Sequence, residues 1–190
     1  MDLIMETKKI EYTITFLSDW HAGSGLSSGA DADAVVIKDS NNLPYLPGKT
    51  IKGLVKDALK DIGNINEETI NLLMGYEIKD SNNKTISTFP GTLFFSNAAL
   101  EKQTEEEIKK YMSHHLYRKI ASTTIDENGI AKSGSLRTME VCIPIELEGY
   151  IDGIQENDIK QLEKAFKYIR HIGLNRNRGL GRCQFKIKSK

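Results

Sequence analysis

KIEYTITFLS, residues 9–18, alternates apolar and polar side chains along most of its length. Ile10, Tyr12, Ile14 and Phe16 would point to one side of an extended chain. A period of two residues is typical of a β-strand with one buried face. The stretch therefore predicts a half-buried strand, and the patterns that follow it along the chain predict what packs around it.

Beyond this strand, strand and helix patterns follow one another in a regular order. The expected helices cover residues 48–62, residues 67–74, residues 104–120, and a last segment from Asn157 or Asp158 to Gly173. The expected strands cover residues 92–100, 139–147 and 180–187. Because the main elements run strand, helix, strand, strand, helix, strand, we expect an α+β fold with a ferredoxin-like, split βαβ antiparallel sheet and insertions.

Composition limits the class of protein. The 190 residues carry 26 Lys or Arg and 26 Asp or Glu, so the formal net charge is zero. This length suffices for a single domain, residues 1–190, whose core needs no disulfides. Cys142 and Cys183 lie in predicted strands, which indicates buried free thiols and a reducing compartment. Apolar stretches are short and no basic flank precedes one, so we expect a cytoplasmic protein without membrane contact.

The most informative segment for function is GLNRNRGLGRC, residues 173–183, here called the Gly-Arg loop. Its glycines allow close backbone approach to a ligand, and Arg176, Arg178 and Arg182 offer planar donors that match phosphate oxygens. From residue 164 to residue 190 there are nine Lys or Arg and no Asp or Glu. The loop predicts a polyanion site, with a solvated basic tail as the alternative.

A second candidate phosphate site lies at the start of the helix over residues 48–62. Gly48, Lys49 and Thr50 resemble part of a nucleotide-binding P-loop, but that motif needs a glycine where this chain has Leu43. The free amides of a helix start, with Lys49, Thr50 and Lys52, could instead hold one backbone phosphate. The alternative is a Pro-initiated helix with solvated lysines.

The loop after the first strand offers candidates for chemistry. Asp31 and Asp33 are two residues apart, so in an extended chain their side chains point to opposite sides and do not share a proton. One of them could bind a divalent cation together with a substrate phosphate, because Mg²⁺ needs few protein oxygens. An acidic turn is the alternative. His21 could act as a general acid or base, or could satisfy a loop carbonyl.

Read together, three segments resemble the RAMP superfamily of CRISPR systems, and in particular the backbone subunits of type III effector complexes. The first segment joins residues 21–25 to residues 33–39, the second covers residues 43–53, and the third is the Gly-Arg loop. The resemblance implies a modified RRM fold whose copies form a filament on a guide CRISPR RNA. It also implies contact with other effector subunits and with a single-stranded target RNA.

The resemblance further implies roles for individual residues. A thumb hairpin interrupts guide–target pairing in that family, and residues 122–137 match it here. An acidic residue of the first loop promotes metal-dependent cleavage of the target, and Asp33 matches that position as a ligand of Mg²⁺ or Mn²⁺, whereas Asp31 does not. The residues Ala34 and Val35 depart from the family pattern, a small polar residue and proline. The expected RNA contacts are His21, Ser24, Lys49, Thr50, Lys52, Arg137, Arg176, Arg178 and Arg182.

Two other functions stay open. A guide-processing endoribonuclease of the same superfamily would use His21 as acid or base and would need no metal. A purely structural RNA-binding subunit would leave the acidic loop inert. An ordinary RRM fits less well, because residues 92–97 lack the basic lead-in of the RRM signature.

Overall fold

The strand predicted from residues 9–18 is strand β1 (Lys8–Phe16) of the structure, a computed structural model that describes residues 7–25, 32–63, 65–109 and 111–188. Tyr12, Ile14 and Phe16 are buried on one face of β1, and Glu11 on the other face is exposed. The alternation in the sequence therefore sets which face of β1 meets the core.

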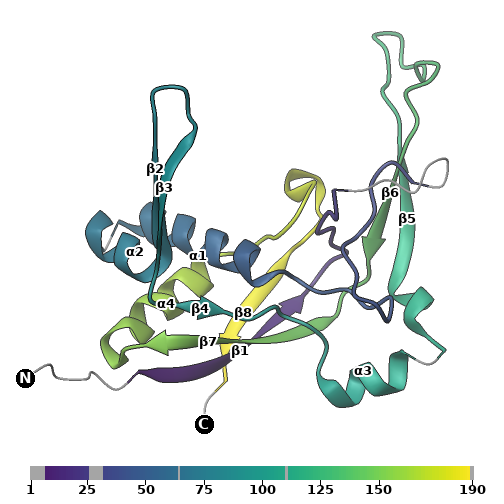
Figure 1. The fold of residues 1–190 in the computed structure, drawn as a ribbon. Helices are drawn as coiled ribbons and strands as arrows, with labels where there is room; N and C mark the ends of the chain where they lie inside the picture. Colours follow the sequence, from purple (N-terminus) through teal and green to yellow (C-terminus); the bar gives the residue numbers. More distant parts are fainter. Residues whose placement is uncertain (1–6, 26–31, 64, 110, 189–190) are drawn as a thin grey trace, which may run out of the picture.

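β1 lies in the middle of a four-stranded antiparallel sheet of order β4-β7-β1-β8. The other three strands are β4 (Phe94–Phe95), β7 (Glu146–Ile154) and β8 (Cys183–Ile187). Helices α1 (Gly48–Ile62) and α4 (Glu156–Tyr168) pack side by side against one face, where their apolar residues join those of β1 in one core (Figure 1). The order β1-α1-β4-β7-α4-β8 is consistent with the expected ferredoxin-like sheet.

The helices start and stop largely where the sequence predicts. α1 ends at Gly63, which adopts a left-handed conformation with φ of 69° and donates its N–H to Leu59 O. Helix α2 (Glu67–Met74) begins at Asn66, whose side chain accepts from Thr69 N. α4 ends at Tyr168, several residues before the Gly173 that was expected to close it.

The region over residues 104–120 was predicted as one helix, and this is wrong beyond its first turns. Helix α3 (Lys102–Ile108) is followed by a short 3₁₀ turn η1 (Ser113–Leu116) and then by strand β5 (Tyr117–Ser122). β5 pairs with β6 (Arg137–Cys142) in a separate two-stranded sheet. Pairing with a distant strand outweighs the local helical pattern of this segment.

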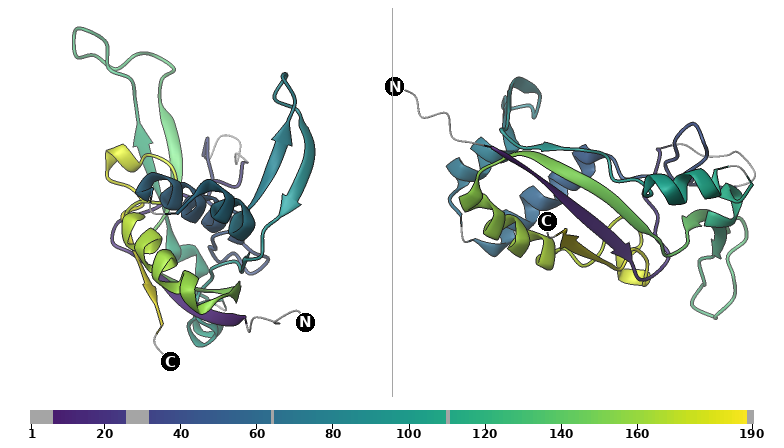
Figure 2. Two further views of the ribbon diagram at one scale, coloured as in Figure 1. Left: turned by 90° about the vertical axis from the view of Figure 1, so that its left-hand side faces the viewer. Right: turned by 90° about the horizontal axis from the view of Figure 1, so that it is seen from below.

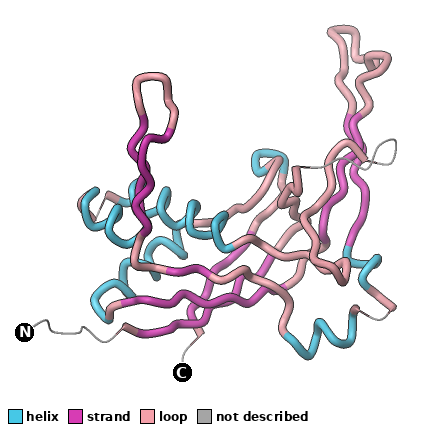
Figure 3. Tube along the Cα trace, in the orientation of Figure 1, coloured by secondary structure: helices cyan, strands magenta, loops and turns pink. Residues whose placement is uncertain are grey.

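β6 and β7 were predicted as one strand over residues 139–147 with a bulge or edge at Pro144. The structure breaks the segment there: β6 belongs to the β5–β6 hairpin and β7 to the main sheet. Proline has no N–H to donate to a strand ladder, which accounts for the break. Residues 123–136 connect β5 to β6 as a long excursion away from the body (Figures 1 and 3).

A second projecting hairpin was not predicted. Among the described strands, β2 (Gly75–Lys79) and β3 (Thr85–Pro90) pair with each other and with no third strand, and the turn expected near residues 80–84 is their connection. Both hairpins project to the same side of the body, with α1 between them (Figures 1 and 2). The strand predicted over residues 92–100 is shorter in the structure. It consists of β4, and Ala98 and Ala99 form isolated β-bridges beyond it.

Other expectations concern thiols and membranes. Cys142 and Cys183 are free and buried, as predicted. Burial raises the pKa of Cys183 to about 12 and also raises the pKa of Cys142, so both thiols stay neutral at physiological pH. No helix in the described ranges is both long and apolar enough to cross a membrane.

Candidate functional site

The Gly-Arg loop is a tight turn that displays its first two arginines. Arg176 and Arg178 bound the short 3₁₀ turn η2 (Arg176–Arg178), flanked by left-handed residues Asn175 (φ 54°) and Gly179 (φ 87°). Both arginines are exposed, and within the described ranges neither guanidinium forms an ion pair. Planar donors held on a rigid turn without internal carboxylates are suited to phosphate oxygens.

The loop is fixed to the end of β1 and to the residues that follow it. Leu174 N donates to His21 O at 3.0 Å, and Gly181 N donates to Asp19 O at 2.7 Å. Gly173 has a φ of 93°, and a Cβ there would collide with the carbonyl oxygen of His21. The Gly-Arg loop and residues 19–21 therefore form one unit, although they are far apart in the sequence.

Arg182 lies apart from the other two arginines of the loop. Its N–H donates to Ser18 Oγ at 3.0 Å and its carbonyl accepts from Leu17 N at 2.8 Å, which ties it to the end of β1. It borders a hollow with Thr15 and Leu17, whereas Arg176 and Arg178 line a hollow of the loop itself. The structure thus does not bring all three arginines to one place.

His21 lies beneath the loop. Its side chain has no exposed surface, and its Nδ1 lies 2.6 Å from Glu140 O. Within the described residues its Nε2 has no hydrogen-bond partner, and it faces the backbone at Gly23, where a Cβ would be 3.3 Å away. A general acid or base must reach its substrate, so this burial argues against both catalysis and RNA contact by His21 and favours a supporting role.

Ser24 lies at the surface end of the same segment and is half-buried. Its N–H and its Oγ both point to Val35 O, at 3.1 and 3.2 Å. These bonds join the two ends of a loop whose residues 26–31, Asp31 among them, lie outside the described residues. Ser24 therefore shapes the loop that leads to Asp33.

Asp33 lies beside Arg137, the first residue of β6, where the excursion over residues 123–136 joins the β5–β6 hairpin. Its N–H donates to Thr138 O at 2.8 Å, and its Oδ2 accepts from Thr138 N at 2.7 Å. Its other oxygen, Oδ1, is 4.0 Å from an Arg137 guanidinium nitrogen, and both side chains are at least half exposed. The carboxylate is held in a fixed orientation with one oxygen free of hydrogen bonds within the described residues.

This arrangement bears on the expected metal. No group of three or more His, Cys, Asp or Glu in the described ranges could hold a metal ion. Asp33 alone could contribute one oxygen, since Mg²⁺ keeps several waters and accepts phosphate oxygens as further ligands. Around Asp33 the described residues therefore offer a metal ion one carboxylate and no complete set of protein ligands.

The Gly-Arg loop and the Asp33 segment meet at Met139. Asn175 Nδ2 lies 3.8 Å from Met139 Sδ, and Ala34 forms a parallel bridge with Met139. One residue further along β6, Glu140 receives Val36 N at 3.0 Å and pairs with Lys38 at 2.8 Å. Residues from both ends of the chain are therefore held together along β6.

The start of α1 offers fewer free amides than the sequence suggests. Gly48 N donates to Asn97 Oδ1 at 2.9 Å, and Thr50 N donates to Pro47 O at 2.9 Å. Lys49 and Thr50 are exposed there. Lys52 turns toward the base of the β2–β3 hairpin, where its Nζ donates to Leu93 O at 2.7 Å.

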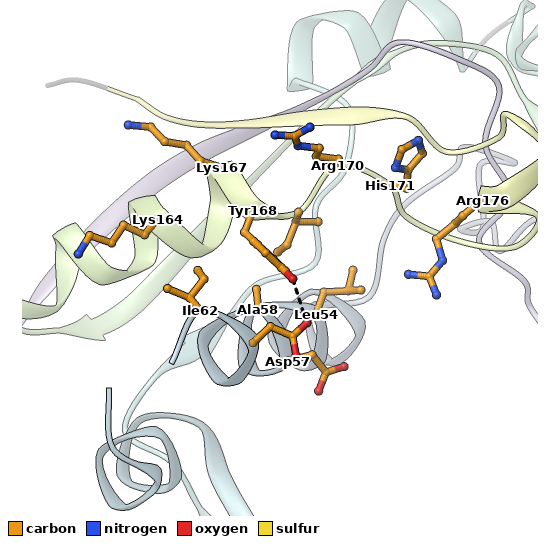
Figure 4. A pocket seen from close by; sticks show the side chains of 12 residues that line it. Leu54, Asp57, Ala58, Ile62, Lys164, Lys167, Tyr168, Arg170, His171 and Arg176 are labelled. Carbon is orange, nitrogen blue, oxygen red and sulfur yellow. Dashed lines mark hydrogen bonds between the residues drawn. The ribbon is translucent and has the colours of Figure 1, made fainter. Parts of the chain in front are cut away.

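A hollow of about 830 Å³ lies between α1, α4 and the residues that follow α4. Figure 4 shows Arg176, Arg170 and His171 along one side and Asp57 on α1 opposite them. Asp61 also lines the hollow, where its carboxylate lies 3.4 Å from the Tyr168 hydroxyl. These two carboxylates repel phosphate, so Arg176 at the rim is better placed for RNA than the hollow itself.

The sheet face opposite the helices is poorly suited to RNA. Because side chains alternate along a strand, β1 and β7 direct several carboxylates to that face. These residues are Glu11, Glu146, Glu148 and Asp152. Lys188 pairs with Glu148 at 2.6 Å. An RRM uses this face to stack bases, but here negative charge would oppose the phosphates.

Comparison with known proteins identifies the family. The family model described as the RAMP superfamily matches residues 13–184, which is most of the chain. The chain belongs to the RAMP superfamily. The match includes the loop after β1, the start of α1 and the Gly-Arg loop, the three segments that carried the resemblance in the sequence. No curated protein matches the sequence.

Solved structures with the same fold extend the comparison. A chain from the cryo-EM structure of the type III-B Cmr-beta complex bound to cognate target RNA superposes with a TM-score of 0.72 and 10% identity, covering 95% of this chain and 97% of that chain. A chain from the apo state of the type III-B Cmr-beta complex superposes with a TM-score of 0.68 and 10% identity. The match covers 96% of this chain and 98% of that chain. The RAMP chain described here thus shares its fold with these chains over nearly its full length.

Some residues of the site were not singled out in the sequence. Asn97 caps α1, Glu140 organises residues 34–38, and Thr138 orients Asp33. Glu140 occupies a regular strand position and Asn97 follows a short strand, so neither carries a local signal. Only the pairing of distant segments reveals their roles.

Proposed function

We propose that this RAMP protein is an RNA-binding subunit of a type III-B CRISPR effector complex that holds the backbone of a guide RNA. One observation carries the proposal: Arg176 and Arg178 are displayed, without ion-pair partners in the described ranges, on a turn that is hydrogen-bonded to the end of β1. Guanidinium groups that are fixed in this way bind phosphates without reading sequence, which base pairing supplies. The fold shared with a chain of an RNA-bound Cmr-beta complex supports the same function.

Further phosphates of the guide would be bound on either side of the Gly-Arg loop. Lys49 and Thr50 at the start of α1 would bind a neighbouring phosphate. Arg137 would bind another phosphate where the excursion joins β6. The excursion over residues 122–137 would act as the thumb, which interrupts pairing between guide and target. Ile125, Ile130 and Leu136 are largely exposed on it and could pack against unstacked bases. Copies of the chain, with other subunits, would line up along the guide.

Salt dependence of RNA binding tests this function. Changing Arg176 and Arg178 to alanine in the full-length chain should weaken binding of single-stranded RNA. It should also reduce the slope of log affinity against log salt by about 1.4, because each single-strand phosphate contact contributes about 0.7. Lys186→Ala, on the opposite sheet face, is the matched control and should change neither quantity. An unchanged slope in the double arginine variant would exclude the loop as a phosphate site.

We further propose that Asp33 supports metal-dependent cleavage of the paired target RNA. Its fixed carboxylate and the adjacent Arg137 can orient a phosphate and the reacting 2′-hydroxyl in line. Mg²⁺ or Mn²⁺ bound with Asp33 and a phosphate would stabilise the charge that develops on the phosphate oxygens. Arg137 would additionally hold the bound RNA strand at the start of β6.

The cleavage hypothesis has a conservative test. In Asp33→Asn, the amide oxygen can still accept from Thr138 N, so the loop keeps its shape while the negative charge is removed. Cleavage of a guide-paired target should fall at least 100-fold and guide affinity should stay unchanged. Asp152→Asn, on the far sheet face, is the control. Cleavage by Asp33→Asn at the wild-type rate would exclude a catalytic role for Asp33.

Two results would favour the alternatives. Cleavage of precursor guide RNA that survives EDTA and is lost in His21→Gln would indicate a processing enzyme, despite the burial of His21. RNA binding without any cleavage, in the presence of Mg²⁺ or Mn²⁺, would indicate a purely structural subunit.

A further inference from the structure

A groove of about 620 Å³ lies between α1 and the unpredicted β2–β3 hairpin. The β2–β3 hairpin that forms one of its walls projects to the same side of the body as the β5–β6 hairpin (Figures 1 and 2). Its walls include Lys52 and Lys56 from α1 and Tyr76 and Phe89 from the hairpin. The groove therefore lies between a cationic wall and an aromatic wall, and Glu77 and Lys79 of the hairpin, whose side chains pair at 3.7 Å, also line it.

The cationic wall is built from two lysines one helical turn apart. Lys52 Nζ donates to Leu93 O at 2.7 Å, and Lys56 Nζ donates to Gly75 O at 2.5 Å. Neither ammonium group forms an ion pair with a carboxylate in the described ranges. Partial burial, and then the charge of Lys56, lower the pKa of Lys52. An anion between the two would relieve this repulsion.

The aromatic wall is a stacked pair on the hairpin. Tyr76 and Phe89 are cross-strand neighbours whose ring centroids lie 4.7 Å apart with an interplanar angle of 11°. They are 39% and 43% exposed, although rings of this size are usually covered. Phe94, at the base of the groove, is also exposed. Exposed ring faces beside cations are the surface on which single-stranded nucleic acids stack.

We propose that this groove binds a nucleotide of single-stranded RNA, with its phosphate at Lys52 and Lys56 and its base against Tyr76 and Phe89. This inference rests on the proposed function, since it extends the RNA path of the Gly-Arg loop across α1 to the second hairpin. A nucleotide satisfies both walls at once. A protein segment would have to bring its own carboxylate to avoid burying two unpaired ammonium groups.

Binding of a fluorescent oligouridine to the full-length chain tests the groove. The double variant Tyr76→Leu/Phe89→Leu keeps apolar area but removes the flat rings, and it should weaken binding about 5-fold or more, as expected for one lost base–aromatic stack. Lys56→Gln should weaken binding and lower the salt slope by about 0.7. Ile86→Ala, an exposed apolar change on the same hairpin, is the control and should have no effect.

Photocrosslinking gives a second readout that does not depend on affinity. RNA that contains 5-iodouridine should crosslink to Tyr76 or Phe89 in the wild-type chain. If crosslinks form only at the Gly-Arg loop and the ring variant binds normally, the groove proposal is overturned and the proposed function stands. If the wild-type chain binds no RNA, both fail. A ring variant with altered self-association and unchanged RNA affinity would assign the hairpin to a protein partner and also overturn the proposal.

Discussion

Two glycines of the Gly-Arg loop differ in what surrounds them, although both have left-handed backbones. At Gly173, with φ of 93°, a side chain would collide with the carbonyl of His21; at Gly179, with φ of 87°, nothing lies within 4 Å of the position of a Cβ. The first glycine permits close packing of the loop on His21, in the segment that follows β1. The second only permits the turn.

Alanine at each position separates these two requirements. Gly179→Ala should cost about 1 kcal/mol of unfolding free energy, the usual penalty of a left-handed residue with a side chain. Gly173→Ala should cost at least about 2 kcal/mol, because backbone strain and the collision with His21 add together. Urea denaturation measures both values. Equal costs would show that the loop does not depend on its contact with residues 19–21.

The buried thiols predict a pH dependence of stability. Burial raises the pKa of Cys183 to about 12 from 9.0, and raises that of Cys142 in the same direction. Neutral thiols are favoured in the folded state, so this contribution is complete below pH 9.0 and is lost as pH rises toward about 12. Denaturant midpoints should therefore fall above about pH 9. Iodoacetamide at pH 8.5 should modify both cysteines only in urea, and rapid native labelling would contradict this.

At the residue scale, the sequence predicts exposed cations well and buried polar groups poorly. Arg176 and Arg178 are exposed in a Gly-rich turn, as their composition suggests. His21 has two interpretations in the sequence, an acid or base and a residue that satisfies a carbonyl, and in the structure the Gly-Arg loop and Glu140 enclose it completely. Enclosure depends on a loop about 150 residues away in the chain, and no local pattern contains that information.

At the scale of elements, errors occur where a segment pairs with a distant partner. Residues 117–122 show apolar spacing compatible with a helix but form β5, whose partner β6 is separated from it by the thumb-like excursion. Pro144 predicts a bulge or an edge in one strand. In the structure the chain passes there from the β5–β6 hairpin to the main sheet, because β7 pairs with β1, which is distant in the sequence. Caps and glycines, by contrast, act locally, and the bounds of α1 and α2 follow from them.

The β2–β3 hairpin contributes little to the core. Its residues 76–79 and 85–90 are all exposed, so shortening it removes almost no buried apolar surface. Replacing residues 77–88 with Asn-Gly should change the unfolding free energy by less than about 1 kcal/mol. Thermal and urea unfolding measure this. A loss above about 2 kcal/mol would mean that the hairpin supports the fold.

For the whole molecule, zero net charge conceals two different sides. The side of the Gly-Arg loop and α1 carries exposed cations, and the opposite sheet face carries the carboxylates of β7. The family and its sheet could be inferred from the order of elements and three motifs. The side of the molecule that would face RNA could not be inferred from the sequence, because the order of strands in the sheet decides which residues share a face.

Hydroxyl-radical footprinting tests this one-sided arrangement. Single-stranded RNA should protect Leu174, which is 53% exposed in the Gly-Arg loop, and leave Tyr150 on the far sheet face unchanged. RNA-free protein is the reference for both residues. Protection of Tyr150 without Leu174 would place RNA on the sheet face, as in an RRM, and would contradict the proposed path.

The central place of β1 has a consequence for how the chain is made. Among the described strands, β1 pairs with β7 and β8, so β1 leaves the ribosome long before either of its partners. At about 5–20 residues per second, that interval is on the order of ten seconds. Until β7 emerges, the strand that carries Tyr12, Ile14 and Phe16 has no partner in the main sheet. Long-range closure of this kind slows folding, so nascent chains should depend on chaperones until β8 emerges.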